Sequence, residues 1–421
     1  TYALMSDEEE SANNTIQAGT LDLQVNGQDG VSKTLDVGPV GSGASGQVTA
    51  TLTNDGSVDG KLDVGIGSVQ SGEGVNNEAE TGDKSAPGEL DDYVFVEVGV
   101  VQNGVEMPAV GPAPLSVLEE FSRGTEALLG ASQDATLYVD WTAPDLGNDA
   151  QGDTVTFDVT LDIVERPTYD PDAVVTSGDS IQAAIDAASA GDLIEVTNGT
   201  YAENVVVDKP LDVVSRNGPA YTSITGDGFA SVQITSSDVS FEGFTVENGS
   251  ANALAVDGKN GGSVSDISVS CSRFVQTSSA TDSLVATIYG GETTNLSFGR
   301  TSFMSTGLRL LYFNSTNTNP GVTDSYFAGA PNDNFGAVGV RDDGGEVTGN
   351  VFVVDLTETS GASFPVTQLG LGGPGANVED NLFETTEDHT AAIADTGDNY
   401  SDVALVDANR FFGGGQKVVN N

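Results

Sequence analysis

Apolar and polar residues alternate along most of the first 166 residues of the chain. The alternation predicts strands, separated by Gly, Asn or Asp turns, at residues 20–25, 47–53, 61–66, 93–101, 135–141 and 154–165. Residues 114–123 instead place Leu115, Leu118 and Phe121 on one face of a helix. About seven strands with such turn signals indicate an antiparallel β-sandwich or jelly roll.

From residue 180 onward the pattern changes to a repeat. Its clearest copies run from Val to Phe at residues 322–327, 347–352, 378–383 and 406–411, and looser copies end at Phe244, Phe274 and Phe303. Successive phenylalanines are 24 to 31 residues apart. A leucine-rich consensus is absent and propeller blades need about 40 residues or more, so the period predicts a parallel β-helix of roughly eight or nine coils. We expect its phenylalanines to stack in an internal ladder, with the Asn or Ser two positions earlier in a tight turn.

Two segments flank the start of this solenoid. Residues 180–189 predict a short amphipathic helix, with Asp179 or Ser180 as N-cap, that covers the open end of the first coil. Residues 166–172 contain two prolines without periodicity and are typical of a stiff linker. The predicted organisation is an N-terminal strand (1–10), a jelly roll (11–166), a linker (167–178) and a β-helix with its capping helix (179–421).

The net charge of the chain indicates the kind of environment in which it folds. It has 63 acidic and 14 basic residues, for a net charge of -49 spread over the whole length. Such self-repulsion strains a compact state at low salt, whereas the Debye length is only about 3 Å at 1 M. The composition therefore indicates a protein from a halophilic organism, and in particular from a halophilic archaeon. It also disfavours nucleic acid and anionic membrane as partners, and no apolar run reaches the roughly 20 residues of a membrane span.

Cysteine and histidine exclude several chemistries. The single cysteine, Cys271, lies on the apolar phase of a strand and is expected to be a buried, inert thiol. The single histidine, His389, excludes H-E-x-x-H zinc chemistry and disfavours a Ser-His-Asp triad.

Six Asn-x-Ser/Thr sequons are candidate N-glycosylation sites and favour an exported protein with a cleaved signal peptide. They are at Asn13, Asn198, Asn248, Asn295, Asn314 and Asn399.

Residues 180–215 read SIQAAIDAASAGDLIEVTNGTYAENVVVDKPLDVVS. The order of helix, Gly-Asp, strand, Gly-Thr-Tyr and Lys-Pro resembles the opening of right-handed β-helix proteins of the pectin-lyase-like and NosD-like group. This resemblance implies the fold and says little about activity.

Several short motifs follow one another through the first half of the chain. They are TYALMSDEEES at the start, AGTLDL at 18–23, LTNDGS at 52–57, WTAP at 141–144, and then Asn148 and AQGD at 150–153. Together they resemble the TasA/camelysin family of surface fibre proteins. The resemblance implies export and polymerisation by donor-strand exchange, in which an N-terminal strand completes the jelly roll of the next subunit. The polymerisation strand would comprise Thr1, Tyr2, Ala3, Leu4 and Met5. The alternative is that these residues pair within their own domain.

One acidic turn is the best candidate for chemistry in the β-helix. Asp342, Asp343 and Glu346 follow Arg341 closely and are a candidate Ca²⁺ or glycan site. In so acidic a chain such clusters arise by chance, so a solvated turn is favoured over a catalytic site.

The resulting hypothesis is an extracellular structural protein. We expect a secreted, non-enzymatic filament subunit (a pilus or biofilm-matrix fibre) that forms a homopolymer. Its β-helix would be an appended, surface-displayed module for adhesion or bundling, with glycans or other surface proteins as further partners. No cofactor is expected, although weak Ca²⁺ binding stays open. The alternatives are a secreted β-helix polysaccharide lyase or hydrolase, and a monomeric glycan-binding surface protein.

Overall fold

A computed structural model is the structure of the protein considered below. It describes residues 21–29, 32–37, 41–73, 87–146, 150, 152–257, 262–276, 285–289, 291–305, 310–313, 317–329, 338–340, 344–354, 367–371, 375–385, 391–395 and 400–420.

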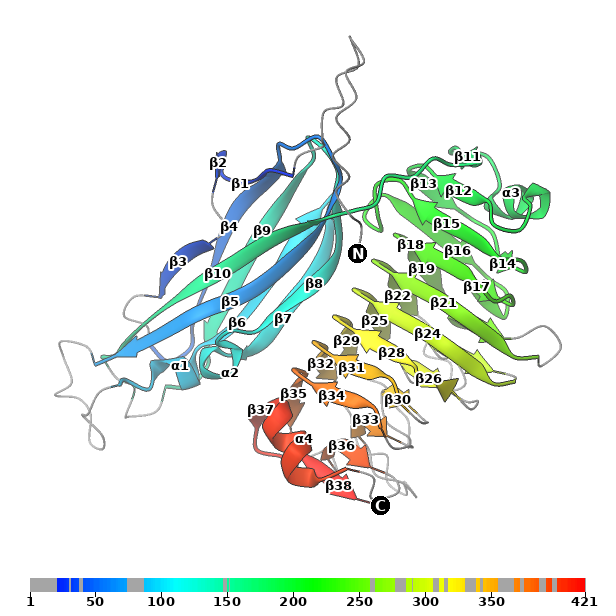
Figure 1. Cartoon of the computed structure of the whole chain (residues 1–421). Coiled ribbons are helices and arrows are strands. Elements are labelled where there is room, and N and C mark those ends of the chain that lie inside the picture. Colours follow the sequence, from blue (N-terminus) through cyan, green and yellow to red (C-terminus); the bar gives the residue numbers. More distant parts are fainter. Residues whose placement is uncertain are drawn as a thin grey trace, which may run out of the picture.

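Two antiparallel sheets form a β-sandwich at one side of the molecule (Figure 1). In spatial order, the first sheet contains β2 (Gln28–Asp29), β1 (Leu23–Val25), β4 (Ala44–Asn54), β9 (Asp134–Ala143), β6 (Phe95–Gln102) and β7 (Val105–Pro114). The second contains β3 (Ser32–Val37), β10 (Thr154–Glu165), β5 (Gly60–Gly72) and β8 (Ser122–Leu129). Two short helices, α1 (Leu90–Tyr93) and α2 (Leu115–Leu118), accompany them.

Three parallel sheets form the β-helix, and each coil between its two ends contributes one strand to each sheet. The sheet that we call the open sheet contains β11 (Ala173–Val175), β12 (Leu193–Val196), β15 (Leu211–Ser215), β18 (Val239–Glu242), β21 (Val264–Ser270), β24 (Thr293–Gly299), β28 (Gly321–Thr323), β31 (Glu346–Thr348) and β34 (Asn377–Glu379), with β27 (Asn317–Thr318) also paired to β24. The covered sheet contains β13 (Gly199–Tyr201), β16 (Thr222–Gly226), β19 (Thr245–Asn248), β22 (Arg273–Gln276), β25 (Ser302–Ser305), β29 (Tyr326–Gly329), β32 (Val351–Val354), β35 (Leu382–Thr385) and β37 (Arg410–Gly413). The third sheet contains β14 (Val205–Val207), β17 (Ala230–Ile234), β20 (Asn252–Asp257), β23 (Ala286–Tyr289), β26 (Leu311–Phe313), β30 (Val338–Val340), β33 (Thr367–Leu371), β36 (Ala391–Asp395) and β38 (Val418–Asn420).

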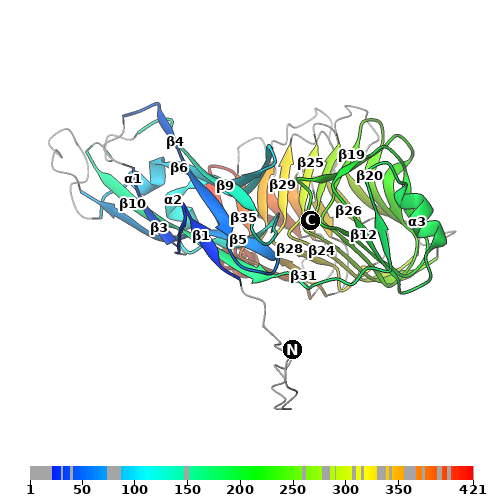
Figure 2. The ribbon, with the colours of Figure 1, turned by 90° about the horizontal axis from the view of Figure 1, so that it is seen from above.

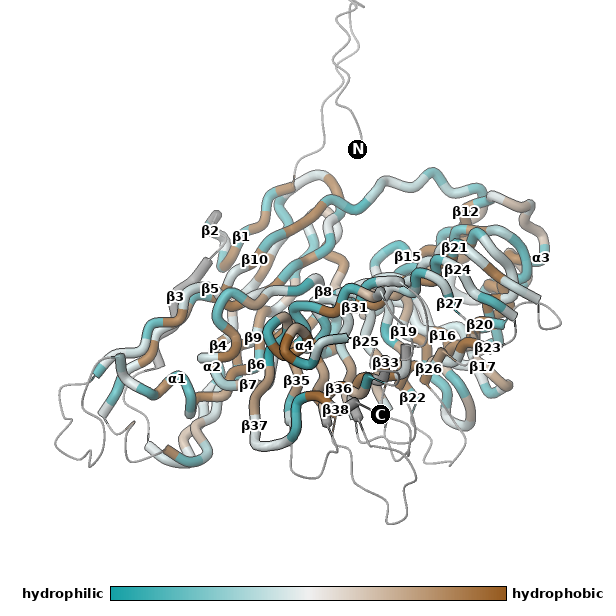
Figure 3. Tube along the Cα trace, turned by 60° about the horizontal axis from the view of Figure 1, so that its bottom comes forward, coloured by the Kyte–Doolittle hydropathy of each residue, from teal (hydrophilic) through white to brown (hydrophobic). Residues whose placement is uncertain are grey.

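The all-β fold class is therefore confirmed, with an antiparallel sandwich followed by a parallel β-helix. Short apolar and polar segments alternate along the strands of both parts (Figure 3). The predicted capping helix is also present as α3 (Ile181–Ala187), at the first coil and on the side of the solenoid away from the sandwich (Figure 2). Its N-cap is Ser180, whose Oγ accepts a hydrogen bond from the Ala183 N–H at 3.1 Å. A second short helix, α4 (Asp402–Ala408), lies at the other end of the coils.

The sandwich departs from the predicted pattern between residues 105 and 129. The predicted helix at 114–123 shrinks to α2, and two strands flank it. β7 contains Pro108 and Pro112, which argue against a strand in sequence. The structure accommodates them because β7 is an edge strand with register shifts against β6, and an edge tolerates missing N–H donors.

The predicted phenylalanine ladder runs through the inside of the covered sheet. Phe303, Phe327 and Phe352 stack with ring centroids 5.0 and 4.9 Å apart, and the ladder continues to Phe274, Phe383 and Phe411. The prediction that Phe244 belongs to this ladder is wrong. Val246 stands in register with Phe274, and Phe244 stacks on Phe241 instead.

The turn before each ladder phenylalanine is also one residue earlier than expected. The residues with positive φ are three before Phe, as at Asp324 (φ 48°) and Asp380 (φ 56°). The Asn or Ser two before Phe points inward: Asn350 and Asn381 are fully buried, and Asn350 Nδ2 donates to Asn381 Oδ1 at 2.8 Å. These amides form a second internal ladder that satisfies buried backbone carbonyls such as Val322 O.

The β-helix packs against the sandwich. The outer face of the covered sheet presents Tyr326, Val351, Leu382 and Phe412, which are buried in the same hydrophobic cluster as the sandwich core. This contact differs from the surface-displayed module expected from the sequence, because the apolar outer face must be covered to exclude water.

Basic residues concentrate at this contact. Arg166 Nε and Lys61 Nζ hold the two oxygens of Glu242 at 2.7 and 2.8 Å. Four further arginines cross between the two parts: Arg123 to Asp324 O, Arg273 to Glu106 O, Arg300 to Leu62 O and Arg410 to Val117 O. In a chain with only 14 basic residues, we infer that this placement compensates the carboxylates that the contact buries.

Candidate functional site

The outward positions of the open sheet form two rows, because side chains alternate along each strand and the coils stay in register. The first row runs Leu193, Asp212, Ser240, Ser268, Ser297, Gly321, Glu346 and Asn377. The second runs Glu195, Val214, Glu242, Ser270, Gly299, Thr323, Thr348 and Glu379. Small and polar residues dominate both rows, in contrast to the outer face of the covered sheet.

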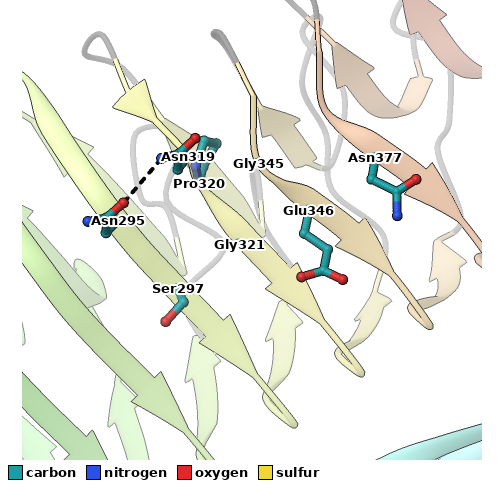
Figure 4. Close-up of a pocket in the computed structure, with 8 residues that line it drawn as sticks. All are labelled: Asn295, Ser297, Asn319, Pro320, Gly321, Gly345, Glu346 and Asn377. Atoms are coloured by element: carbon teal, nitrogen blue, oxygen red, sulfur yellow. Dashed lines mark hydrogen bonds between the residues drawn. The ribbon is translucent and has the colours of Figure 1, made fainter.

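An open hollow of about 470 Å³ lies over the last strands of this sheet (Figure 4). Its lining comprises Asn295, Ser297, Asn319, Pro320, Gly321, Gly345, Glu346 and Asn377. Gly321 is the smallest residue of the first row and Ser297 beside it is also small, so the surface drops between the amides of Asn295 and Asn319 and the carboxylate of Glu346.

A column of tight turns forms one wall of the hollow. In the coils from β18 to β34, a residue with positive φ lies before or near the start of the open-sheet strand: Asp238 (55°), Asp266 (56°), Asn295 (53°), Asn319 (53°), Gly344 (81°) and Gly375 (89°). Asn and Asp tolerate this backbone best among residues with a side chain. Their side chains bond from coil to coil, with Asn295 Nδ2 donating to Asp266 Oδ1 at 2.8 Å and Asn319 Nδ2 to Asn295 Oδ1 at 3.3 Å.

Glycine ends this column of side chains. At Gly344 a Cβ atom would lie 2.8 Å from Asn319 Oδ1, and at Gly345 one would lie 2.2 Å from Pro320 O. These two positions therefore require glycine, and the space beside Asn319 stays open.

Two exposed carboxylates lie at this end of the face, on neighbouring coils. Glu346 is in the first row of β31, and its Oε1 lies 3.5 Å from Thr348 Oγ1. Glu379 is in the second row of β34, and its Oε1 accepts a hydrogen bond from Asn377 Nδ2 at 2.6 Å. One strand spacing of about 4.8 Å and two residues along the strand separate their Cα atoms by roughly 8 Å.

Of the predicted acidic turn, the structure places only Glu346, which lines the hollow. Asp342 and Asp343 lie outside the described residues, as do the predicted polymerisation strand (Thr1, Tyr2, Ala3, Leu4 and Met5) and His389.

The sequons divide in the same way. Asn13, Asn314 and Asn399 lie outside the described residues. Asn198 is exposed and Asn295 is an exposed wall residue of the hollow, whereas Asn248 is 1% exposed and its Oδ1 accepts from the Ser250 and Ala251 N–H groups. Of these three sequons, Asn198 and Asn295 are therefore the accessible ones in the folded chain.

The sequence reasoning missed Asn319, Asn377 and Glu379. A usable signal was present for the first of these, because an Asx residue directly before an apolar strand residue recurs at Asp238, Asp266 and Asn295. Cys271 is buried as expected, and burial raises the pKa of its thiol to about 11.

The described ranges contain neither a cluster of three or more metal-ligating side chains nor a helix that could span a membrane. There, no three or more His, Cys, Asp or Glu side chains are grouped so that they could hold a metal ion. The helices of the same ranges are all too short or too polar to cross a membrane.

No protein-family model matches the sequence, and no curated protein matches it either. Among solved structures, a pectin methylesterase in complex with a hexasaccharide is 14% identical, with a TM-score of 0.32, over 60% of this chain and 90% of that one. Carrot pectin methylesterase is 12% identical, with a TM-score of 0.30, over 61% and 84%. The catalytic domain of a GH87 α-1,3-glucanase in complex with nigerose is 11% identical, with a TM-score of 0.31, over 96% and 86%. At these values the likeness concerns the β-helix fold alone.

The prediction of a non-enzymatic filament subunit is corrected at this point. The solved structures named above are pectin methylesterases and a GH87 α-1,3-glucanase, which are enzymes that act on carbohydrates.

Proposed function

We propose that the chain is a polysaccharide-acting enzyme that holds a neutral glycan across the open sheet and hydrolyses it. The observation that carries the proposal is the hollow of about 470 Å³ lined by amides, a hydroxyl, glycines and one carboxylate. Sugars present many hydroxyl groups, which need closely spaced donors and acceptors. Asn295, Asn319 and Asn377 supply both, and the regular coils repeat such groups along a linear ligand.

Charge favours a neutral substrate. Among the described residues that line the hollow, Glu346 is the only acidic or basic one, and Glu379 is the nearest acidic residue in the second row. Neither offers a positive charge to an anionic polysaccharide, which a chain with a net charge of -49 would also repel. A neutral glycan avoids this cost.

The two carboxylates suit hydrolysis with inversion. An inverting glycosidase uses an acid and a base about 6.5–9.5 Å apart, which leaves room for the attacking water. The Cα atoms of Glu346 and Glu379 are roughly 8 Å apart on adjacent coils. Both side chains leave the same outward face of the sheet and are exposed, so their rotation can bring the carboxyl groups to such a separation. Asn377 donates a hydrogen bond to Glu379, and Thr348 Oγ1 lies 3.5 Å from Glu346 Oε1. These contacts hold the two carboxyl groups on the same side of the sheet.

The proposal is tested by reducing-end release from neutral glucans, mannans and galactans at molar salt. We expect Glu346→Gln and Glu379→Gln each to lower the rate by about 10² or more, because each removes one partner of the proton transfer. Asp212→Asn is the matched control, since Asp212 is an exposed acid in the same row five coils away. Binding without cleavage by the wild-type chain would contradict hydrolysis and favour a glycan-binding protein.

Location and the first half belong to the same proposal. The exposed sequon at Asn198 and the proposed glycan groove support an extracellular setting. The acidic composition supports a halophilic source. The resemblance of residues 11–166 to the TasA/camelysin family, the boundaries of the four predicted segments and self-association through residues 1–5 stay predictions.

A further inference from the structure

The β5–β10 ladder of the sandwich ends on the side away from the solenoid (Figure 1), and an acidic residue adjoins each of the two strands there. The antiparallel pairing of β5 with β10 ends at Gly72 and Thr154. Glu73 follows the first and Asp153 precedes the second, so they are the next two residues across the ladder. Directly opposed like charges destabilise a strand pair.

Both acids are held with buried, unsatisfied oxygens. Asp153 is 1% exposed; its Oδ2 accepts a hydrogen bond from the Glu89 N–H at 2.8 Å, whereas its Oδ1 is buried without a hydrogen-bond partner. Both carboxylate oxygens of Glu73 are buried without a partner as well.

Close packing keeps the Asp153 carboxylate in place. A Cβ atom at Gly88 would lie 2.7 Å from Asp153 Oδ2 and 2.8 Å from the Gly72 carbonyl carbon. Glycine at position 88 thus lets the backbone close over the carboxylate, which cannot turn out to solvent.

Burying an uncompensated carboxylate is costly, and none of the ion pairs between described residues involves Glu73 or Asp153. Three buried carboxylate oxygens without hydrogen-bond donors are of the type that a hard cation prefers as ligands. We propose that Asp153 and Glu73 bind one Ca²⁺ ion at this end of the sandwich. Ca²⁺ accepts six to eight oxygens in flexible geometry, so backbone carbonyls and water complete a site with two carboxylates from the chain. The site is separate from the groove and does not depend on the proposed hydrolysis.

The test is thermal unfolding of the full chain in molar KCl, first with a chelator and then with added CaCl₂ or MgCl₂. We expect Ca²⁺ to raise the Tm of the wild type by about 5 °C. The Asp153→Asn/Glu73→Gln double variant should match or exceed the wild-type Tm in chelator, because the repulsion is removed, and should not respond to Ca²⁺. Glu165→Gln, at the opposite end of β10, should respond as the wild type does.

Two results would overturn the site. One is a wild-type Tm that Ca²⁺ leaves unchanged while acidification raises it, since the two carboxylates would then share a proton. The other is a Ca²⁺ response that persists in the double variant. Should the double variant fail to fold, Glu73→Gln alone, titrated by calorimetry with CaCl₂, gives the same decision through loss of the binding heat.

Discussion

The open and covered sheets of the β-helix share one backbone repeat, but the outer face of one lines a hollow and that of the other is buried against the sandwich. In the same three coils, the covered sheet turns Tyr326, Val351 and Leu382 outward, and all three are at most 3% exposed beneath the sandwich. The open sheet turns Gly321, Glu346 and Asn377 outward, and these line the hollow. The backbone repeat is shared, so it determines neither role. The outward side chains decide which face becomes a buried contact and which becomes a site.

The largest expected effect comes from moving a charge onto the covered face. Leu382→Asp places a carboxylate in the contact with the sandwich, where it has no partner, and should lower the unfolding free energy by about 4 kcal/mol or more. Asn377→Asp introduces the same charge on the exposed face of the same coil. It loses the hydrogen bond to Glu379 and adds a screened repulsion at the surface, so it should cost no more than about 1 kcal/mol at molar salt. Denaturant unfolding at molar salt measures both. Equal losses in the two variants would remove the distinction between the faces.

A smaller loss is expected at the corner where the sandwich meets the open sheet. Glu242→Gln leaves Arg166, which is 3% exposed, and Lys61 without their shared carboxylate and should cost about 3 kcal/mol. Glu195→Gln removes the partner of Arg216, which is half exposed, and should cost about 0–1 kcal/mol. A cost for Glu242→Gln no larger than that of Glu195→Gln would show that the buried ion pairs do not hold the two parts together.

The same carboxylate gives a pH dependence. Burial alone raises the pKa of Glu242, but Arg166 and Lys61 outweigh it and hold that pKa below its usual value. Because the folded pKa is the lower one, Glu242 stabilises the fold above the unfolded value of about 4.3, and this contribution is lost as the pH falls through the folded pKa. Between pH 5 and pH 3, unfolding curves should therefore shift less for Glu242→Gln than for the wild type. Equal shifts would contradict the assignment.

The smallest effect on stability is expected in the groove itself. Glu346 is exposed, and the described structure gives it one weak contact, at 3.5 Å from Thr348 Oγ1. Glu346→Gln should therefore leave the Tm within about 1–2 °C of the wild type. A large fall in Tm would mean that the residue supports the fold, and any loss of activity would then be uninformative.

Sequence predicts the inside of the β-helix better than its outside. The ladder through Phe303, Phe327 and Phe352 follows from the repeat, because one coil always places the same residue type at the same interior position. Phe244 fails because an early coil puts Val246 in that position. The hollow depends on residues such as Ser297 and Gly321, which meet only after the register of neighbouring coils is known.

The contact between the sandwich and the β-helix could not be predicted from the sequence either. Alternation along a strand shows that Val351 and Phe352 face opposite ways, but not that another sheet covers the outer one. β7 escaped prediction because its prolines exclude a central strand and its place at an edge is a tertiary fact.

Blocking the hollow tests the central claim most directly, namely that the open sheet is the glycan face. Ser297→Trp fills the hollow, and Ser240→Trp places the same side chain in the same row two coils away. Co-sedimentation with the neutral polysaccharide that the wild type cleaves, at molar salt, measures the affinity of each. The account predicts a loss of about tenfold or more for Ser297→Trp and affinity near that of the wild type for Ser240→Trp, with both variants folded. Wild-type affinity in Ser297→Trp would contradict it.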